Sequence, residues 1–142
     1  MAPGRDILSV RPVPLLEDHT AEYWEAARRR EFRVQRCAGC ELWLHPPRHT
    51  CPRCASEALT FERASGRGRV YGFTISHTPG GPGFEDVPYG IAVVELDEQP
   101  GLITVGNLLD CPLDEYKVGL PVEVAFEELE DGTVLPQWRM VL

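Results

Sequence analysis

The sequence predicts a mainly β protein built from an N-terminal helix, a rubredoxin-like zinc ribbon and a C-terminal five-stranded OB-fold barrel. Two Cys-x-x-Cys pairs, Cys37–Cys40 and Cys51–Cys54, stand with ten residues between them. Short runs of alternating apolar residues follow residue 68 and are separated by turn residues. The 142 residues include 13 Gly and 13 Pro, which favours short strands joined by turns over long helices.

The chain divides into an N-terminal arm and helix (1–31), the zinc ribbon (32–63) and the barrel (64–142). Residues 1–16 contain Pro and no clear period, which indicates an extended arm that becomes ordered against a partner. We expect a helix over roughly residues 19–30, capped by Asp18 or Thr20. So short a helix needs tertiary support. Its aromatic pair, Tyr23 and Trp24, therefore packs on its own chain or meets another protein, and the sequence favours neither.

The cysteine pairs predict a structural zinc site with Cys37, Cys40, Cys51 and Cys54 as ligands. Two residues between thiolates form a tight knuckle, and four thiolates complete a tetrahedral sphere that leaves no open position for catalysis. Two disulfides, or a redox-active dithiol, are the less favoured alternatives. His45 and His49 lie between the pairs and are substitute ligands in principle, but we expect them to be surface or packing residues.

The start of the chain lacks the apolar core of a signal peptide, and no apolar run approaches the length of about 20 residues that crosses a membrane. We therefore expect a cytoplasmic protein with no membrane partner, in which cysteines stay reduced and bind metal.

Alternation and turn signals predict five strands after residue 68, at 69–77, 91–96, 102–109, 122–128 and 135–141. The first strand is expected to carry Tyr71, Phe73 and Ile75 on one face. Residues 111–119 have room for one or two helical turns between the third and fourth strands. This small insert matches an OB-fold better than an SH3-like barrel.

The connection from His77 to Tyr89 is too long for a simple hairpin. Long loops on small barrels are usually functional or mobile, and this one carries the apolar rings of Phe84 and Tyr89. We read it as a binding loop, with a mobile flap as the alternative. Cys111 has no second thiol nearby in the sequence, and we expect it to be an inert buried thiol.

The net charge of −8 is unevenly placed. Residues 1–63 hold ten Lys/Arg and nine Asp/Glu, a balance of +1, whereas residues 64–142 hold four and thirteen, a balance of −9. A phosphate backbone would be repelled by the acidic half. The charge therefore disfavours the alternative function of these folds, single-stranded nucleic-acid binding.

The order of the motifs resembles the zinc-ribbon/OB-fold proteins first catalogued as domain of unknown function thirty-five. The resemblance rests on the aromatic helix at 22–27, Cys37–Cys40, the Pro46-Pro47-Arg48 segment before Cys51–Cys54, and barrel segments at 68–74, 87–89 and 118–122. It covers about residues 15 to 142.

The resemblance implies an accessory subunit that catalyses nothing by itself. Members of that family partner thiolases, lipid-transfer-protein-type thiolases or aldolases, and hydroxymethylglutaryl-CoA synthases, and some are fused to a hydratase-like domain. We therefore expect a hetero-oligomer with a thiolase-like or aldolase-like subunit that acts on acyl-CoA, in lipid or steroid side-chain metabolism. The lyase or acyltransferase activity would reside in the partner, and acyl-CoA would be shared with it.

No Ser-His-Asp set, activated cysteine or paired-carboxylate site is evident in the sequence. An autonomous acyl-CoA-binding or thioester-processing enzyme, which would need Cys111 or His77 as its reactive group, is thus disfavoured. The candidate residues for contacts with a partner or ligand are Tyr23, Trp24, Arg36, Arg48, His77, Phe84 and Tyr89. Arg36 and Arg48 are candidates because a guanidinium binds phosphate as a bidentate fork, which suits coenzyme A.

Overall fold

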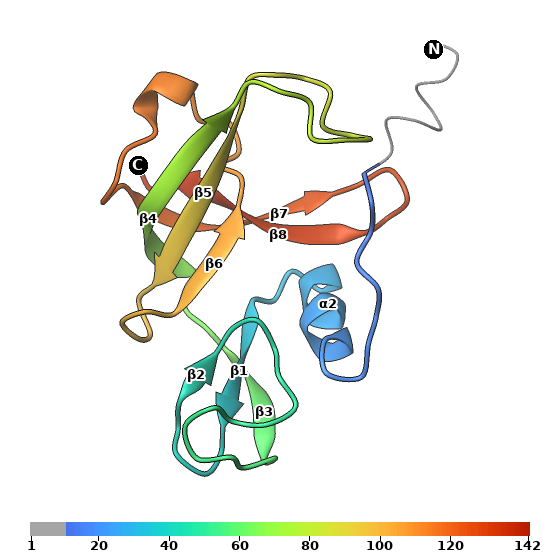
Figure 1. Ribbon diagram of the computed structural model, residues 1–142, viewed down its shortest axis with the longest axis vertical. Coiled ribbons are helices and arrows are strands. Elements are labelled where there is room, and N and C mark those ends of the chain that lie inside the picture. The colour runs from blue at the N-terminus through green and yellow to red at the C-terminus, as the bar shows by residue number, and fades with distance from the viewer. Residues whose placement is uncertain (1–10) are drawn as a thin grey trace.

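The structure, a computed structural model, describes residues 11–142. Most of the predicted N-terminal arm, residues 1–10, lies outside the described residues. A short helix, α2 (Ala21–Arg28), precedes two antiparallel β-sheets that are arranged one after the other along the long axis of the molecule (Figure 1). The prediction of a mainly β fold with a single N-terminal helix is confirmed over this range.

The first sheet has three strands and carries the cysteine pairs at one end. Its strands are β1 (Arg33–Cys37), β2 (Trp43–Leu44) and β3 (Leu59–Arg63), in the order β2-β1-β3. Cys37 closes β1, and its partner in the register with β3 is Leu59. The central strand therefore delivers the first thiol directly to the end of the sheet, as a zinc ribbon requires.

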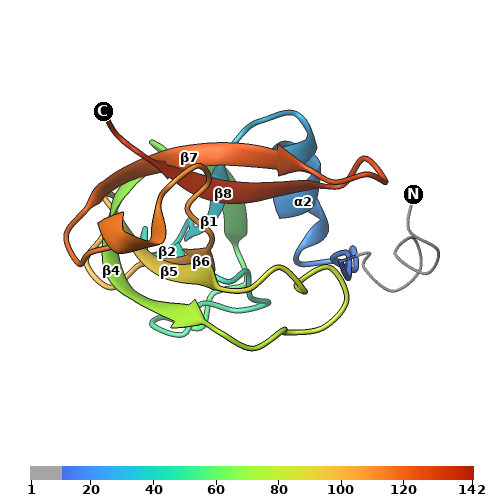
Figure 2. The ribbon, with the colours of Figure 1, turned by 90° about the horizontal axis from the view of Figure 1, so that it is seen from above.

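The second sheet is a curled half-barrel with the strand order β6-β5-β4-β7-β8. Its elements are β4 (Arg67–Ser76), β5 (Tyr89–Leu96), β6 (Ile103–Gly106), the 3-10 helix η1 (Leu113–Glu115), β7 (Pro121–Glu128) and β8 (Val134–Met140). Figure 2 shows the curl, with β7 and β8 on one side of the barrel and β4, β5 and β6 on the other. An isolated parallel bridge joins Leu108 to Trp138, where the two ends of the sheet approach each other.

The five-stranded order with an insert before the fourth strand confirms the predicted OB-fold. All five strands begin within two residues of the predicted starts, but the third, β6, is shorter than expected and ends at Gly106. The expected one or two helical turns are the single 3-10 turn η1.

The helix differs from its prediction in length and in capping. It covers residues 21–28 instead of 19–30, and although Thr20 is its N-cap residue, no side chain caps it. The hydroxyl oxygen of Thr20 instead accepts a hydrogen bond from the backbone N–H of Glu17, at 3.1 Å. Thr20 thus organises the turn before the helix and leaves the helix amides without a side-chain acceptor.

A β-bulge in β4 overturns the expectation that Tyr71, Phe73 and Ile75 share one face. The register shifts between Val70 and Gly72, so that Phe73 lies opposite Ala92, which is fully buried. Residues directly opposite each other in an antiparallel pair point to the same face. Phe73 and Ile75 therefore lie on the inner face of the sheet, while Tyr71 points outward and is 62% exposed. A period of two cannot predict such an inserted residue.

The core runs without interruption from the ribbon into the barrel. Phe32, which leads into β1, is buried against Trp138 of β8, and Tyr23 of α2 packs beside it. Hydrogen bonds also connect the tip of the β5–β6 hairpin to strand β2 of the ribbon. The Gln99 side-chain amide donates to the Trp43 carbonyl at 3.1 Å and accepts from the Trp43 N–H at 3.0 Å. Ribbon, helix and half-barrel therefore share one packed interior. No helix in the described part is long and apolar enough to cross a membrane.

Candidate metal centre

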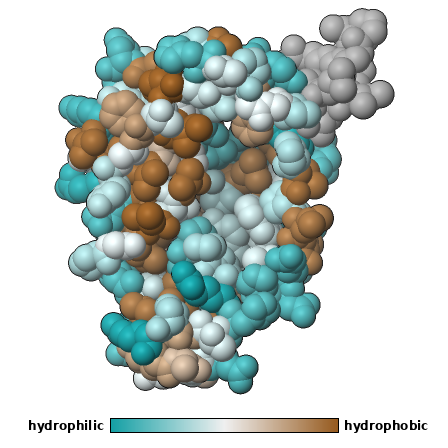
Figure 3. Space-filling model, in the orientation of Figure 1, coloured by the Kyte–Doolittle hydropathy of each residue, from teal (hydrophilic) through white to brown (hydrophobic). Residues whose placement is uncertain are grey.

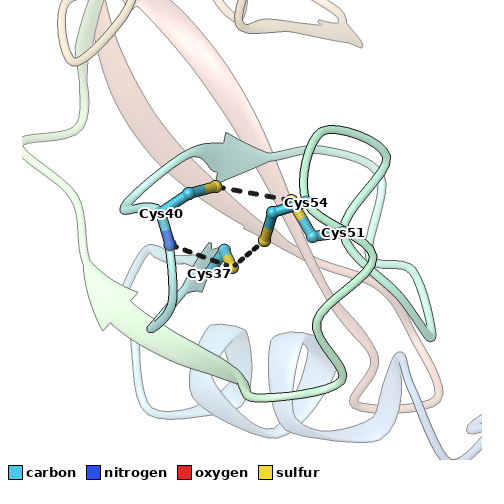
Figure 4. A group of neighbouring side chains, drawn as sticks. All are labelled: Cys37, Cys40, Cys51 and Cys54. Atoms are coloured by element: carbon cyan, nitrogen blue, oxygen red, sulfur yellow. Dashed lines mark hydrogen bonds between the residues drawn. The ribbon is translucent and has the colours of Figure 1, made fainter.

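The four paired cysteines converge at the end of the ribbon, two from each knuckle (Figure 4). Their ligand atoms all lie within 4.8 Å of one another. The closest contacts cross between the knuckles: the Cys37 and Cys54 sulfurs are 3.5 Å apart, and the Cys40 and Cys51 sulfurs are 3.6 Å apart. The sulfurs thus surround one common point.

This arrangement fits a tetrahedral zinc ion. With Zn–S bonds of about 2.3 Å, the edge of a regular ZnS4 tetrahedron is about 3.8 Å. The observed separations, between 3.5 Å and the 4.8 Å limit, bracket that edge. With four protein ligands no coordination position is left for a substrate, so the zinc is structural.

Backbone N–H groups point at sulfur atoms in both Cys-x-x-Cys knuckles. The N–H of Cys40 points at the Cys37 sulfur, and the N–H of Arg53 points at the Cys51 sulfur, both at 3.4 Å. The Leu42 amide is the largest influence that lowers the pKa of Cys40, to about 6, and the Cys40 amide likewise lowers the pKa of Cys37. Cys37 and Cys40 therefore reach the thiolate form, which binds metal, more readily than an ordinary cysteine. The neighbouring Cys37 thiol instead raises the pKa of Cys54, so this thiol depends on the metal for its deprotonation.

Neither histidine of the ribbon loop joins the four sulfurs. His49 is exposed and its ring lies against that of His19, with ring centroids 4.2 Å apart and planes tilted by 42°. The His45 side chain instead packs between the ribbon and the barrel. Its ring lies 5.2 Å from the ring of Tyr23, and its Nε2 is 3.4 Å from the Thr104 hydroxyl. Its Nδ1 is buried with no hydrogen-bond partner, and burial lowers the pKa of His45 to about 4. The His45 imidazole between the ribbon and the barrel is therefore neutral at pH 7.

The predicted aromatic pair of the helix is divided between the interior and the surface. Tyr23 is 7% exposed, packs against Phe32 and has its pKa raised by burial, so its side chain belongs to the chain's own core. Trp24 is half-buried and meets the Tyr23 ring edge-on at 4.9 Å. Only Trp24 of this pair keeps substantial surface for a partner.

The two predicted arginines differ in how far they are engaged within the ribbon. Arg36 lies over the Trp43 ring at 4.7 Å, donates to the Glu41 carbonyl and faces Glu62 at 3.5 Å. Arg48 is exposed, and its backbone is held by Gln35 through two hydrogen bonds of 2.7 and 2.9 Å. The Arg48 side chain is therefore the freer of the two cations.

The structure brings Phe84 and Tyr89 together and leaves His77 apart. The two rings lie 5.8 Å apart in the β4–β5 connection, whereas His77 is exposed just after β4. Phe84 and Tyr89 border two hollows. One, of about 290 Å³, lies at the open end of the half-barrel and is also lined by Asn107, Cys111 and Tyr116. The other, of about 280 Å³, lies beside β5 and β6 and is also lined by Ile91 and Val105.

Cys111 lies at the wall of the first hollow and is half-buried, not fully buried as expected. Burial, together with the nearby charges of Glu115 and Asp114, raises the pKa of its thiol. The thiol therefore stays protonated at neutral pH, which agrees with an inert residue and opposes a role as nucleophile.

Sequence reasoning missed a polar cluster at the same end of the barrel. Arg11 pairs with Glu127 at 2.9 Å, and the Gln137 amide donates to Glu127 and to Asn107, at 3.0 and 3.3 Å. These residues come from the arm, β6's end, β7 and β8, and no spacing in the sequence connects them. Arg11 also shows that the predicted arm contacts its own barrel at this residue. The one available signal was the presence of a polar residue, Gln137, in an otherwise core-like strand.

The fold and the four-sulfur site define a class of protein, a zinc ribbon joined to an OB-fold. Comparisons with known proteins agree. Residues 24–60 match the family model for the rubredoxin-like zinc ribbon domain of ChsH2, and residues 61–127 match the model for its C-terminal OB-fold domain. The chain belongs to the ChsH2-type DUF35 family.

Two archaeal relatives match over most of their own length. The chain is 33% identical to a DUF35 domain-containing scaffold protein of Pyrococcus furiosus, over 81% of this chain and 86% of that protein. A scaffold protein of Methanothermobacter thermautotrophicus is 34% identical, over 70% of this chain and 77% of the relative.

Longer relatives carry enzyme names. A probable enoyl-CoA hydratase alpha subunit of Thermomonospora curvata is 37% identical over 92% of this chain, and this match covers 40% of the relative. The chain thus spans about two fifths of that relative's length.

Solved structures show the same architecture. A chain of an Ltp2-ChsH2(DUF35) aldolase superposes with a TM-score of 0.82 at 36% identity, covering 91% of this chain and 99% of the other. A DUF35 protein of unknown function from Sulfolobus solfataricus superposes with a TM-score of 0.61 at 13% identity, over 87% and 86% of the two chains, which shows the shared fold alone.

Proposed function

We propose that this protein is a non-catalytic accessory subunit of an enzyme that acts on acyl-CoA, with a thiolase-fold partner such as a thiolase or a lipid-transfer-protein-type aldolase. The observation that carries the proposal is the match along 91% of this chain to a chain of an Ltp2-ChsH2(DUF35) aldolase, at 36% identity. The names of the archaeal relatives, which are called scaffold proteins, support the same role.

The chemistry of the described residues supports an assisting role. The metal ligands form a closed set of four thiols. The remaining thiol, Cys111, has a raised pKa. A group that attacks a thioester must be activated by a base or by a lowered pKa, and Cys111 shows the opposite shift. Turnover is therefore assigned to the partner.

Within this proposal, the half-exposed ring of Trp24 is the candidate anchor for the partner, since aromatic residues dominate binding energy at interfaces. The buried Tyr23 ring packs against the Trp24 ring and helps to fix its position. Arg48, and secondarily Arg36, are candidates for the phosphates of coenzyme A. The loop with His77, Phe84 and Tyr89 would border the acyl-CoA passage.

A relative is named 3-oxo-4,17-pregnadiene-20-carboxyl-CoA hydratase alpha subunit, from Mycobacterium tuberculosis, at 34% identity over 81% of this chain and 36% of its own length. Its name motivates the finer proposal that the acyl group is a steroid side chain or another bulky lipid.

The test is co-purification with thiolase-fold proteins encoded beside this chain, followed by native mass and by thioester turnover with and without it. We expect a stable hetero-oligomer and a turnover that depends on both chains. Trp24→Ala should weaken the assembly at least about tenfold, whereas Glu22→Ala, on the same helix and exposed, should not. A monomer that neither binds nor affects such a neighbour, or turnover by the chain alone, would contradict the proposal. A salt-sensitive shift of a labelled single-stranded oligonucleotide would favour the nucleic-acid alternative.

A further inference from the structure

Arg11, near the N-terminus, contacts the tip of the loop that connects β4 and β5. The Arg11 Nε–H donates to the carbonyl of Gly83 at 3.4 Å, and the guanidinium lies over the Phe84 ring, 5.0 Å from its centroid. Gly83 has φ +84°, and a Cβ there would meet the backbone nitrogen of Arg11 at 2.7 Å. The two segments are therefore packed backbone to backbone.

Arg11 is in turn anchored to the barrel wall by a relay of charged and amide groups. Its Nη1 pairs with the Glu127 carboxylate at 2.9 Å, and the Gln137 amide donates to the same carboxylate oxygen at 3.0 Å. The relay continues through Asn107, whose amide donates to the Gly90 carbonyl at 2.6 Å. One continuous chain of contacts thus links the tip of the loop to its base at the start of β5.

Apart from this relay, the described backbone of the loop is bonded mainly to itself. The Gly80 N–H donates to the Phe84 carbonyl at 3.4 Å, and the Phe84 N–H donates to the Gly81 carbonyl at 3.0 Å. These short-range bonds can move with the loop as a unit. The contacts with Arg11 are the ones that must break if the loop moves away from the barrel.

The loop also divides the two hollows. Phe84, Tyr89 and Asn107 border both the 290 Å³ hollow at the end of the barrel and the 280 Å³ hollow beside β5 and β6. In the orientation of Figure 3, hydrophobic residues gather over β5 and β6, on the face where the second hollow lies. Movement of Phe84 would remove a wall that the two hollows share.

We propose that residues 79–88 form a lid, that the Arg11–Glu127 pair is the latch that holds it closed, and that opening it joins the two hollows into one passage. The pair is suited to a reversible latch because it is only partly buried, with side chains 29% and 26% exposed. Partly exposed ion pairs are weak enough to open and close readily. The lid is a property of the isolated chain and does not depend on the proposed accessory role.

The test is hydrogen–deuterium exchange of the zinc-loaded chain, followed in peptides that cover residues 79–88. Arg11→Met keeps the aliphatic stem and removes the charge, and should speed exchange in this loop about fivefold. Arg30→Met is the matched control, because Arg30 pairs with the neighbouring Glu128 at the same 2.9 Å but does not contact the loop's hydrogen-bond relay. It should leave exchange in residues 79–88 unchanged.

Glu127→Gln removes the negative charge of the latch and should also speed exchange, but less than Arg11→Met, which in addition loses the contacts of Arg11 with Gly83 and Phe84. The double variant should exchange no faster than Arg11→Met alone, because the ion pair is already broken there. Cys111 lines the first hollow, so its reaction with a bulky maleimide, located by peptide mapping, should also quicken in Arg11→Met. Unchanged loop exchange in folded Arg11→Met and Glu127→Gln proteins would overturn the latch. Equal acceleration in Arg30→Met would also overturn it.

Discussion

The ring of Phe32 meets the ring of Trp138 edge-on, with centroids 5.6 Å apart and planes at 85°. Phe32 directly precedes β1 of the ribbon, and Trp138 is the largest fully buried side chain of the half-barrel. This contact makes the two sheets parts of one core, so we expect the ribbon and the barrel to unfold together.

Replacing Phe32 by Ala should destabilise the whole chain and not the ribbon alone. Truncating a buried Phe costs about 3–5 kcal/mol, through lost burial and the cavity left behind. Urea unfolding followed by tryptophan fluorescence should show one transition shifted to lower urea. Tyr71→Ala, which removes an outward-facing ring that is 62% exposed, is the control and should cost less than about 0.5 kcal/mol. Separate transitions for ribbon and barrel would show that the shared core is not cooperative.

Replacing Cys37 by Ser should remove zinc and unfold the ribbon, because metal binding supplies folding free energy in such sites. Elemental analysis of the purified protein would measure the loss, and chelation of the wild-type protein should reproduce it. Cys111→Ser, which changes the thiol outside the cluster, should retain the metal. A wild-type chain that is folded and metal-free would contradict the structural role.

Stability should fall between pH 7 and pH 5 because of His45. Its pKa is about 4 in the folded chain, against 6.5 for an ordinary histidine. The unfolded chain therefore takes up this proton before the folded chain does, and the associated stability is present above pH 6.5 and lost progressively toward pH 4. His45→Gln should reduce the loss of stability between pH 7 and pH 5 by about 2 kcal/mol.

The control for that experiment is His49→Gln, since His49 is exposed. Protonation of the metal ligands affects both variants equally, so the difference between them isolates His45. Identical pH profiles for His45→Gln and the wild-type chain would show that the buried ring does not govern this dependence.

Substitution by Ala should destabilise the protein at one of two glycines in neighbouring strands and leave its stability unchanged at the other. A Cβ at Gly90, in β5, would overlap the ring of Tyr116, whereas a Cβ at Gly72, in β4, would meet nothing within 4 Å. Overpacking a well-filled interior costs about 1–3 kcal/mol, so Gly90→Ala should lower the unfolding temperature and Gly72→Ala should not. Thermal unfolding of the two variants measures the contrast. Equal melting temperatures would mean that the Tyr116 ring moves aside without cost.

The sequence by itself determined the parts of this protein that depend on short-range pattern. The spacing within Cys37–Cys40 and Cys51–Cys54 was enough to predict a closed thiolate site, because a knuckle is built from adjacent residues. Alternation with a period of two placed the strands of the half-barrel, because side chains of a strand point alternately to its two faces. The bulge at Val70 broke that period, and the faces assigned to Tyr71 and Phe73 were then wrong.

The tertiary structure alone decided which distant side chains meet. Arg11 and Glu127 are 116 positions apart, and Tyr23 became a core residue only because β1 and β8 close over α2. A hydrogen bond or ring contact requires two groups within a few ångströms, and the curl of the sheet, not the spacing of residues along the chain, sets that distance.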